Sequence, residues 1–211
     1  MKKWLIMILA ALSILTYSCK RDTENNIPVV VKSDYYHLKT GNYWIYQRFN
    51  IDTNGVATPT AEYDSAYIEK DTLIRGYTYQ KLIENPYVLF PSPSAFYLRD
   101  SSGYLVSSNG NIMASSTNFT DVLKVDTSHT DLYIGYLQMT GKDSVVTTPA
   151  GSFQSITPRM KIVPTPPNPA NLPVRYTFEV YGKGVGKLKM HTFFFYGGIG
   201  YETRLIRYKI N

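Results

Sequence analysis

Apolar and polar residues alternate along most of the chain beyond residue 40, and a period of two is typical of β-strands. The first such run is YWIYQR, residues 43–48, in which one face would hold Tyr43, Ile45 and Gln47 and the other Trp44, Tyr46 and Arg48. Further runs occupy residues 63–70, 77–83, 95–99, 104–107, 122–126, 143–147, 153–163, 175–181, 186–196 and 202–210. After residue 19 no helical period extends beyond about two turns. The pattern therefore predicts a chain that is mainly β, with little helix.

Turn-forming residues separate these runs and set where the strands end. Gly41 begins a turn before the first run, and DSSG, residues 100–103, links two runs as a hairpin. In TTPAGSF, residues 147–153, Pro149 fixes φ and Gly151 permits a positive φ. This stretch is therefore expected to turn the chain into the next strand.

Two further stretches bear on the shape of the predicted sheet. Gly184 and Gly186 in YGKGVGKLK are expected to relieve curvature where the sheet bends. PTPPNPANLP, residues 164–173, has five prolines in ten residues, so it can neither pair as a strand nor continue a helix. We interpret it as an exposed hairpin loop within one domain, residues 34–211. About ten strands with turns between them then predict an all-β fold, a strongly curved antiparallel sheet or open β-barrel.

The first 18 residues have the organisation of a bacterial signal peptide. Two lysines precede Trp4–Leu15, a twelve-residue apolar stretch interrupted only by Ser13. At the rise of a helix this stretch is about 18 Å long, short of the hydrocarbon core of about 30 Å. LTYSC, residues 15–19, resembles a lipobox, so Cys19 is expected to carry a diacylglyceryl group and become the new N-terminus. The alternatives are a plain signal peptide with an incidental cysteine, and a signal anchor.

Lipidation of Cys19 would account for a single cysteine in an exported chain, where an unpaired thiol is rare. Two or three acyl chains, palmitate among them, hold a protein to a membrane that it does not span. Residues 19–33 then form a lipidated, flexible tether. The expected location is the cell envelope, on the outer membrane, with the domain facing the periplasm or the surface.

The charge of the chain argues against a nucleic-acid partner. The chain carries +6, and removal of the signal takes away two lysines and no acidic residue, which leaves +4. The basic residues are scattered, with no block of five or six. The expected partners are the membrane, through the lipid, and either a small apolar molecule or an envelope protein.

Four motifs occur in order along the chain: YYHLKTGNYWIYQ, TTPAGSF, YGKGVGKLK and YETRLIRYKI. Together they resemble those of small envelope lipoproteins of Bacteroidota-type bacteria. The resemblance covers residues 35–210 and implies a strongly curved antiparallel sheet, distantly similar to the LolA/LolB open barrels that carry lipoproteins. It implies no established activity. Lys187 and Leu188 follow Gly186 where the family more often has two apolar residues, so Lys187 departs from its pattern.

The glycine-rich stretch GKGVGK does not fit a phosphate-binding loop. Three residues separate Gly182 from Gly186, where four are needed, and Leu188 stands where Ser or Thr would hold magnesium. The stretch also runs from strand to strand, without a helix N-terminus to receive phosphate. Nucleotide binding is therefore not expected.

The sequence predicts no catalytic residue, metal or cofactor. The three histidines lack metal-ligand spacing: His37, His129 and His191. Acidic residues that meet only in the fold leave a hydrolase open as an alternative, with candidates Asp64, Glu69, Asp71 and Glu84. We prefer to interpret these four as solvated strand and turn positions.

Two groups of residues are candidate functional positions. FFFYGGIGY, residues 193–201, is either buried core or an aromatic rim at the mouth of a barrel, with ligand-binding candidates Phe193, Phe195, Tyr196 and Tyr201. Three tripeptides resemble the Asp-Ser/Thr-apolar acceptor of O-glycosylation in Bacteroidota-type bacteria, at Ser65, Thr72 and Ser144.

The functional hypothesis is a non-catalytic lipoprotein that binds an apolar or amphiphilic ligand. The pocket is expected between the concave face of the sheet and the loop around residues 164–173. Tyrosine is abundant, with 19 residues, and can line such a space while its hydroxyl binds a polar group. The alternative is an accessory or structural subunit of a complex for glycan binding or adhesion, with exposed tyrosines as contacts.

Overall fold

A computed structural model describes residues 32–85, 93–128, 132–168, 171–194 and 199–211. Its contacts divide the chain into two units, residues 1–30 and 31–211, and only the second is described here. The predicted signal peptide, Cys19 and the tether up to residue 31 lie outside the described residues. Among the residues described, all regular structure is β-strand.

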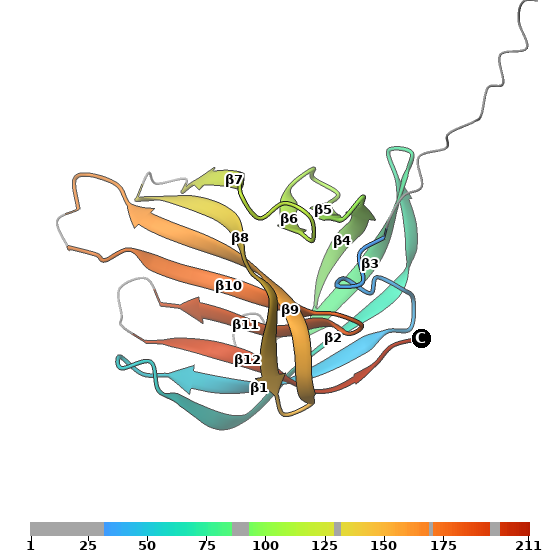
Figure 1. Ribbon diagram of the computed structural model, residues 1–211, viewed down its shortest axis with the longest axis horizontal. Coiled ribbons are helices and arrows are strands. Elements are labelled where there is room, and N and C mark those ends of the chain that lie inside the picture. Colours follow the sequence, from blue (N-terminus) through green and yellow to red (C-terminus); the bar gives the residue numbers. More distant parts are fainter. Residues whose placement is uncertain (1–31, 86–92, 129–131, 169–170, 195–198) are drawn as a thin grey trace, which may run out of the picture. The chain divides into compact units, whose positions relative to one another are not determined.

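Twelve strands form one antiparallel sheet (Figure 1). They are β1 (Tyr43–Ile51), β2 (Ala57–Ile74), β3 (Tyr77–Asn85), β4 (Ser94–Ser101), β5 (Tyr104–Ser107), β6 (Ile112–Ser115), β7 (Val122–Thr127), β8 (Tyr133–Thr148), β9 (Gly151–Pro164), β10 (Arg175–Gly182), β11 (Gly186–Phe193) and β12 (Gly200–Lys209). The predicted fold class is confirmed. The predicted count of about ten is low, and β6 is the strand that no predicted run covers. β8 was predicted, but it begins ten residues before the predicted run.

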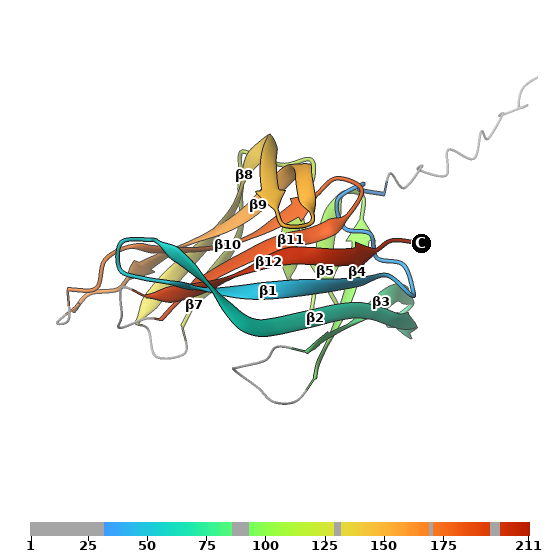
Figure 2. The same ribbon diagram turned by 90° about the horizontal axis from the view of Figure 1, so that it is seen from below.

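The strand order joins two meanders at a single seam. The order is β6-β5-β4-β3-β2-β1-β12-β11-β10-β9-β8-β7, so every pairing joins strands that are consecutive in the chain except the pairing at the β1–β12 seam. Figure 2 shows this seam, with β2 and β11 on its two sides. The two edges of the sheet, β6 and β7, are consecutive in the chain. The sheet curls until β6 reaches β8, where the backbone N–H of Ser115 lies 3.2 Å from Sδ of Met139, and forms a nearly closed barrel.

Alternating residues of most strands supply the core inside this barrel, whereas β7 contributes no buried residue. On β1, Trp44 and Tyr46 are each 4% exposed, and on β2 Ala66 and Ile68 are buried in the same way. The period of two puts these side chains on one face of their strands. The alternation used to predict the strands therefore also predicts which face they bury.

The segment just before β1, residues 33–42, packs into one end of the barrel. Tyr36 is 3% exposed, donates a hydrogen bond from its hydroxyl to the carbonyl of Gly103 (3.0 Å) and meets the ring of Tyr181 edge to face. The backbone N–H of Ser33 donates to the carboxylate of Asp100. This segment therefore packs as part of the unit 31–211.

Two of the predicted turns join strands as expected. Pro149 lies in the tight turn between β8 and β9, and Gly151, just after it, has φ of 135°. The Pro-rich loop connects β9 to β10, and these two strands pair antiparallel. It is therefore a hairpin loop within one domain.

The turn between β10 and β11 provides a test of local packing. Gly184 and Gly186 both have positive φ, but a Cβ would meet open space at Gly184 and the ring of Trp44 at 3.1 Å at Gly186. Trp44 is held there because its indole N–H donates to the carbonyl of Val185 (2.7 Å). We expect Gly184→Ala to lower the free energy of unfolding by about 1 kcal/mol through backbone strain. Gly186→Ala should cost about 1–2 kcal/mol more because of the added clash.

Urea denaturation of the two variants measures this difference. Equal losses in the two variants would contradict a fixed position for the Trp44 ring.

Candidate functional site

An apolar cavity of about 130 Å³ lies inside the barrel, next to the segment 33–42. Five aromatic residues line it: Tyr36, Trp44, Tyr46, Phe96 and Tyr181. Aliphatic side chains of β2 to β6 complete the apolar wall. Phe96 and Met113 are 44% and 41% exposed, so they lie where the cavity opens to solvent. The volume is close to that of an engineered apolar cavity of about 150 Å³ that binds benzene.

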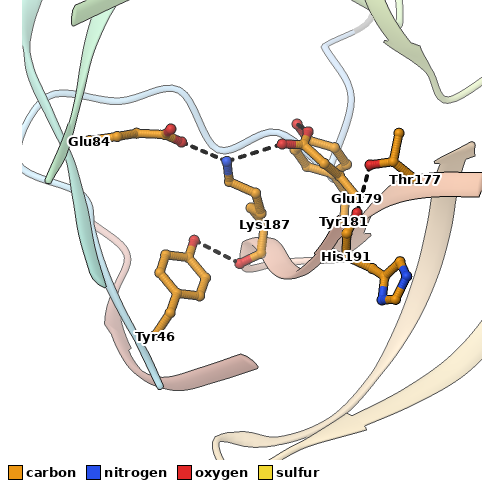
Figure 3. Close-up of polar contacts among 7 residues, drawn as sticks. All are labelled: Tyr46, Glu84, Thr177, Glu179, Tyr181, Lys187 and His191. Carbon is orange, nitrogen blue, oxygen red and sulfur yellow. Dashed lines mark hydrogen bonds and ion pairs between the residues drawn. The ribbon is translucent and has the colours of Figure 1, made fainter. Parts of the chain in front are cut away.

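Three charged side chains meet at one wall of this cavity: Glu84, Glu179 and Lys187. Nζ of Lys187 lies 2.6 Å from Oε1 of Glu84 and 3.2 Å from Oε1 of Glu179. Figure 3 shows the lysine between the two carboxylates, which come from opposite sides. Glu84 belongs to β3, whereas the other two belong to β10 and β11. We call these three residues the carboxylate–lysine cluster.

Two tyrosines support the carboxylate–lysine cluster. The hydroxyl of Tyr181 donates to Oε2 of Glu179 (2.5 Å), and the hydroxyl of Tyr46 donates to the backbone carbonyl of Lys187 (3.1 Å). Figure 3 draws the contact of Tyr46 with Lys187 as a dashed line and shows Tyr181 next to Glu179. The cluster thus has hydrogen-bond partners on each side, which fixes where its charges lie.

The cluster is deep in the barrel yet in contact with the cavity. The side chain of Lys187 is 16% exposed and each carboxylate 28%. Burial disfavours the charged form of Glu179, but the Lys187 ammonium and the Tyr181 hydroxyl outweigh it and lower the pKa of Glu179. Burial also opposes the charge on Lys187, yet the two carboxylates raise its pKa well above the usual value. Glu179 and Lys187 therefore interact as an ion pair near neutral pH.

The formal charge of the cluster is −1, because two carboxylates share one ammonium. A second ionic group, around Arg48 of β1, also has a net negative formal charge. Arg48 is 4% exposed and lies 3.6 Å from Glu62 and 3.7 Å from Asp64, again one cation with two anions. Each of these two groups therefore carries a formal charge of −1, although the whole chain is basic.

The structure brings none of the described ligand-binding candidates into the cavity. Phe193 lies at a separate groove beside the start of β10. Tyr201 is 8% exposed and packs under the guanidinium of Arg48, 4.5 Å from its ring centroid. Phe195 and Tyr196 lie outside the described residues.

The cavity also differs in position from the one that the sequence predicted. The described residues of the Pro-rich loop, 164–168 and 171–173, do not line it. The segment 33–42 takes that place, because Tyr36 and Leu38 form part of the wall.

Of the four candidate acids, only Glu84 lies in the cavity. Asp64 pairs with Arg48 as described, and Asp71 lies in a polar cleft beside the segment 33–42. Glu69 forms an exposed ion pair with Lys81 (2.7 Å), and this lysine lowers the pKa of Glu69.

The histidines do not converge in the part of the chain that the structure describes. Nε2 of His37 lies 2.7 Å from the carbonyl of Asp34, and His191 stacks on Phe178 with ring centroids 4.9 Å apart. His129 lies outside the described residues. Among the residues described, no group of three or more His, Cys, Asp or Glu side chains could hold a metal ion. The described residues also contain no helix long and apolar enough to cross a membrane.

The three candidate glycosylation residues all lie in strands. Ser65 on β2 is half-buried and accepts a hydrogen bond from Asn85 (3.3 Å). The hydroxyl oxygen of Thr72 is buried. Ser144 on β8 is exposed and donates to the carbonyl of Gly141 (2.8 Å). Ser144 is thus the most accessible of the three.

Glu179, Lys187 and the two tyrosines were not predicted as site residues. One signal was present: Lys187 stands where the lipoproteins that the motifs resemble more often have an apolar residue. A charged residue at a core position of a strand is costly unless it is paired, so it points to a partner inside the fold.

Comparisons with known proteins give the fold and no more. No family model matches the chain, and no curated protein matches it. A solved structure described as a "putative lipoprotein" from Parabacteroides distasonis aligns with 84% of this chain and 99% of its own, at 12% identity and a TM-score of 0.50. Another, a "putative exported protein with YmcC-like fold" from Bacteroides fragilis, covers 85% and 100% at 11% identity and a TM-score of 0.49.

The chain thus shares its curved antiparallel fold with a putative lipoprotein from Parabacteroides distasonis. This agrees with the fold that the sequence motifs implied.

Proposed function

We propose that this protein is a lipid-anchored, non-catalytic envelope protein that shelters a small apolar or amphiphilic ligand in the barrel cavity. The observation that carries the proposal is the cavity itself, with an apolar, largely aromatic wall and charged groups at one side. Ligand sites are commonly concave and apolar, with a few polar groups that fix orientation. The lipid on Cys19 would hold the protein on the outer membrane, where apolar molecules partition.

The charged groups support binding rather than hydrolysis. A glycosidase needs one carboxyl group that is protonated near neutral pH, which requires a raised pKa. In the carboxylate–lysine cluster the pKa of Glu179 is lowered instead, and Glu84 is held 2.6 Å from an ammonium. Neither group is arranged to donate a proton to a leaving group.

Filling the cavity tests the proposal. Ala66 lines the cavity and is 3% exposed, so Ala66→Leu places extra methyl groups in the empty space. We expect protein extracted gently from its own membrane to carry a small apolar guest, and the Ala66→Leu protein to carry at least about tenfold less. Native mass spectrometry measures the bound mass.

Ala95→Leu is the matched control, because Ala95 on β4 is exposed and does not line the cavity. It should leave the bound mass unchanged. Wild-type protein that carries no guest would argue against the proposal, and an accessory-subunit role would then be preferred.

A further inference from the structure

The carboxylate–lysine cluster gives the cavity a sign of charge. Two carboxylates and one ammonium face the same space, and the neighbouring Arg48 is likewise paired with two acids. A ligand with a positive head would neutralise the remaining charge of the cluster. A ligand with a negative head would add a third anion close to the other two.

The hydrogen-bonding groups of the cluster also favour a positively charged ligand, because such a ligand donates hydrogen bonds. A carboxylate accepts up to about four hydrogen bonds, and among the described residues Glu84 accepts one, at Oε1 from Lys187. Two of the three N–H donors of Lys187 are already directed at carboxylates. Acceptors are therefore in excess at this wall, so a ligand that donates hydrogen bonds is favoured.

The aromatic wall adds a second attraction for cations. Tyr36, Trp44, Tyr46, Phe96 and Tyr181 line the same cavity. The faces of aromatic rings attract ammonium groups, and cages of several rings are a recurrent way to bind them. The aromatic rings lie beside the carboxylate–lysine cluster, which has a net negative charge. Together they can bind an amine that has an apolar body.

We infer that the ligand of this cavity is a small organic cation, an amine or ammonium compound with an apolar body, whose charged nitrogen lies at Glu84 and Glu179. The inference rests on the proposed function and specifies the chemical class of the ligand. The fatty acid that an apolar barrel first suggests is disfavoured, because its carboxylate would meet two others and a lysine that they already share.

Three probes of one shape and different charge test the inference. Benzylammonium, benzyl alcohol and benzoate each carry one aromatic ring, a body of the size that a cavity of this volume holds. NMR titration of the mature chain, made as Cys19→Ser so that it stays unlipidated, follows the methyl signals of Leu105 and Met113. We expect the dissociation constant of benzylammonium to be at least about tenfold below that of benzyl alcohol, with benzoate weakest.

Glu84→Gln then removes one anion without changing the shape of the site. The cluster becomes neutral, and the preference for benzylammonium over the alcohol should fall to within about threefold. Glu69→Gln is the matched control, because it removes the same charge from an exposed pair on β2, and the preference should persist.

Other outcomes overturn the inference. Equal binding of the three probes, or tightest binding of benzoate, would refute the cationic ligand while leaving a binding cavity in place. Benzylammonium binding that survives Ala66→Leu would show that the amine binds elsewhere. If none of the probes binds, the inference fails, and the guest found by native mass spectrometry then decides whether the proposed function fails with it.

Discussion

Replacing Lys187 with Met is expected to lower the free energy of unfolding by about 2–4 kcal/mol. The substitution keeps the length of the side chain but leaves Glu84 and Glu179 together without a cation. Removal of one partner from a fully buried ion pair costs about 3–5 kcal/mol, and contact with the open cavity reduces that figure here. Urea denaturation of the purified domain measures the loss.

A matched control and a rescue separate charge from packing. Lys81→Met removes a lysine from an ion pair of similar length, 2.7 Å, on the exposed side of β2 and β3, and it should change stability little. Adding Glu84→Gln and Glu179→Gln to Lys187→Met should restore most of the lost stability, since no unpaired charge remains. If the single variant is as stable as wild type, water rather than Lys187 solvates the carboxylates.

The same variant should respond to acid in the opposite direction from wild type. In wild type the pKa of Glu179 is lowered by folding, so its contribution to stability is present above the unfolded pKa of about 4.5 and is lost as pH falls through the folded pKa. Without Lys187, burial dominates and raises the pKa of Glu179 above the unfolded value. The variant then gains stability as pH falls, and the gap to wild type narrows towards pH 4.

Replacing Cys19 with Ser is expected to abolish attachment to the membrane. Serine cannot form the thioether, so the precursor should remain unacylated and should not be cleaved before residue 19. Metabolic labelling with a fatty-acid analogue, followed by membrane fractionation, measures both effects. A Ser18→Ala chain keeps a small residue before the cysteine and should still be acylated. Label that persists in the Cys19→Ser chain would contradict lipidation at Cys19.

The strands could be predicted where the alternation of residue types along the sequence matches the alternation of buried and exposed positions in the structure. β1 is the example, because its apolar Trp44 and Tyr46 face inward between more exposed neighbours. The first half of β8 was missed because the inward position 135 is a glycine, where Sδ of Met160 fills the space of a side chain. β6 was missed because four residues between turns are too few to establish a period.

The site could be predicted only in part. Aromatic residues inside a curved sheet follow from composition and alternation, which is why an apolar cavity was expected. The carboxylate–lysine cluster did not follow, because Glu84 and Lys187 are 103 residues apart and meet only when the sheet closes. A lysine in a strand is usually solvated, so its departure from the family motif gave no indication of which partner it would find.

The seam between β1 and β12 has a consequence for how this chain reaches its native state. Every other strand pairing joins neighbours in the sequence, but the seam pairs Tyr43 with Lys209. β12 is the last strand of the chain, so the two meanders have no register with each other until the C-terminal residues are in place. Closure of this long loop is then the slow, entropy-limited step of folding. A chain cut short before β12 would have two unjoined half-sheets with exposed edges, a form prone to aggregation.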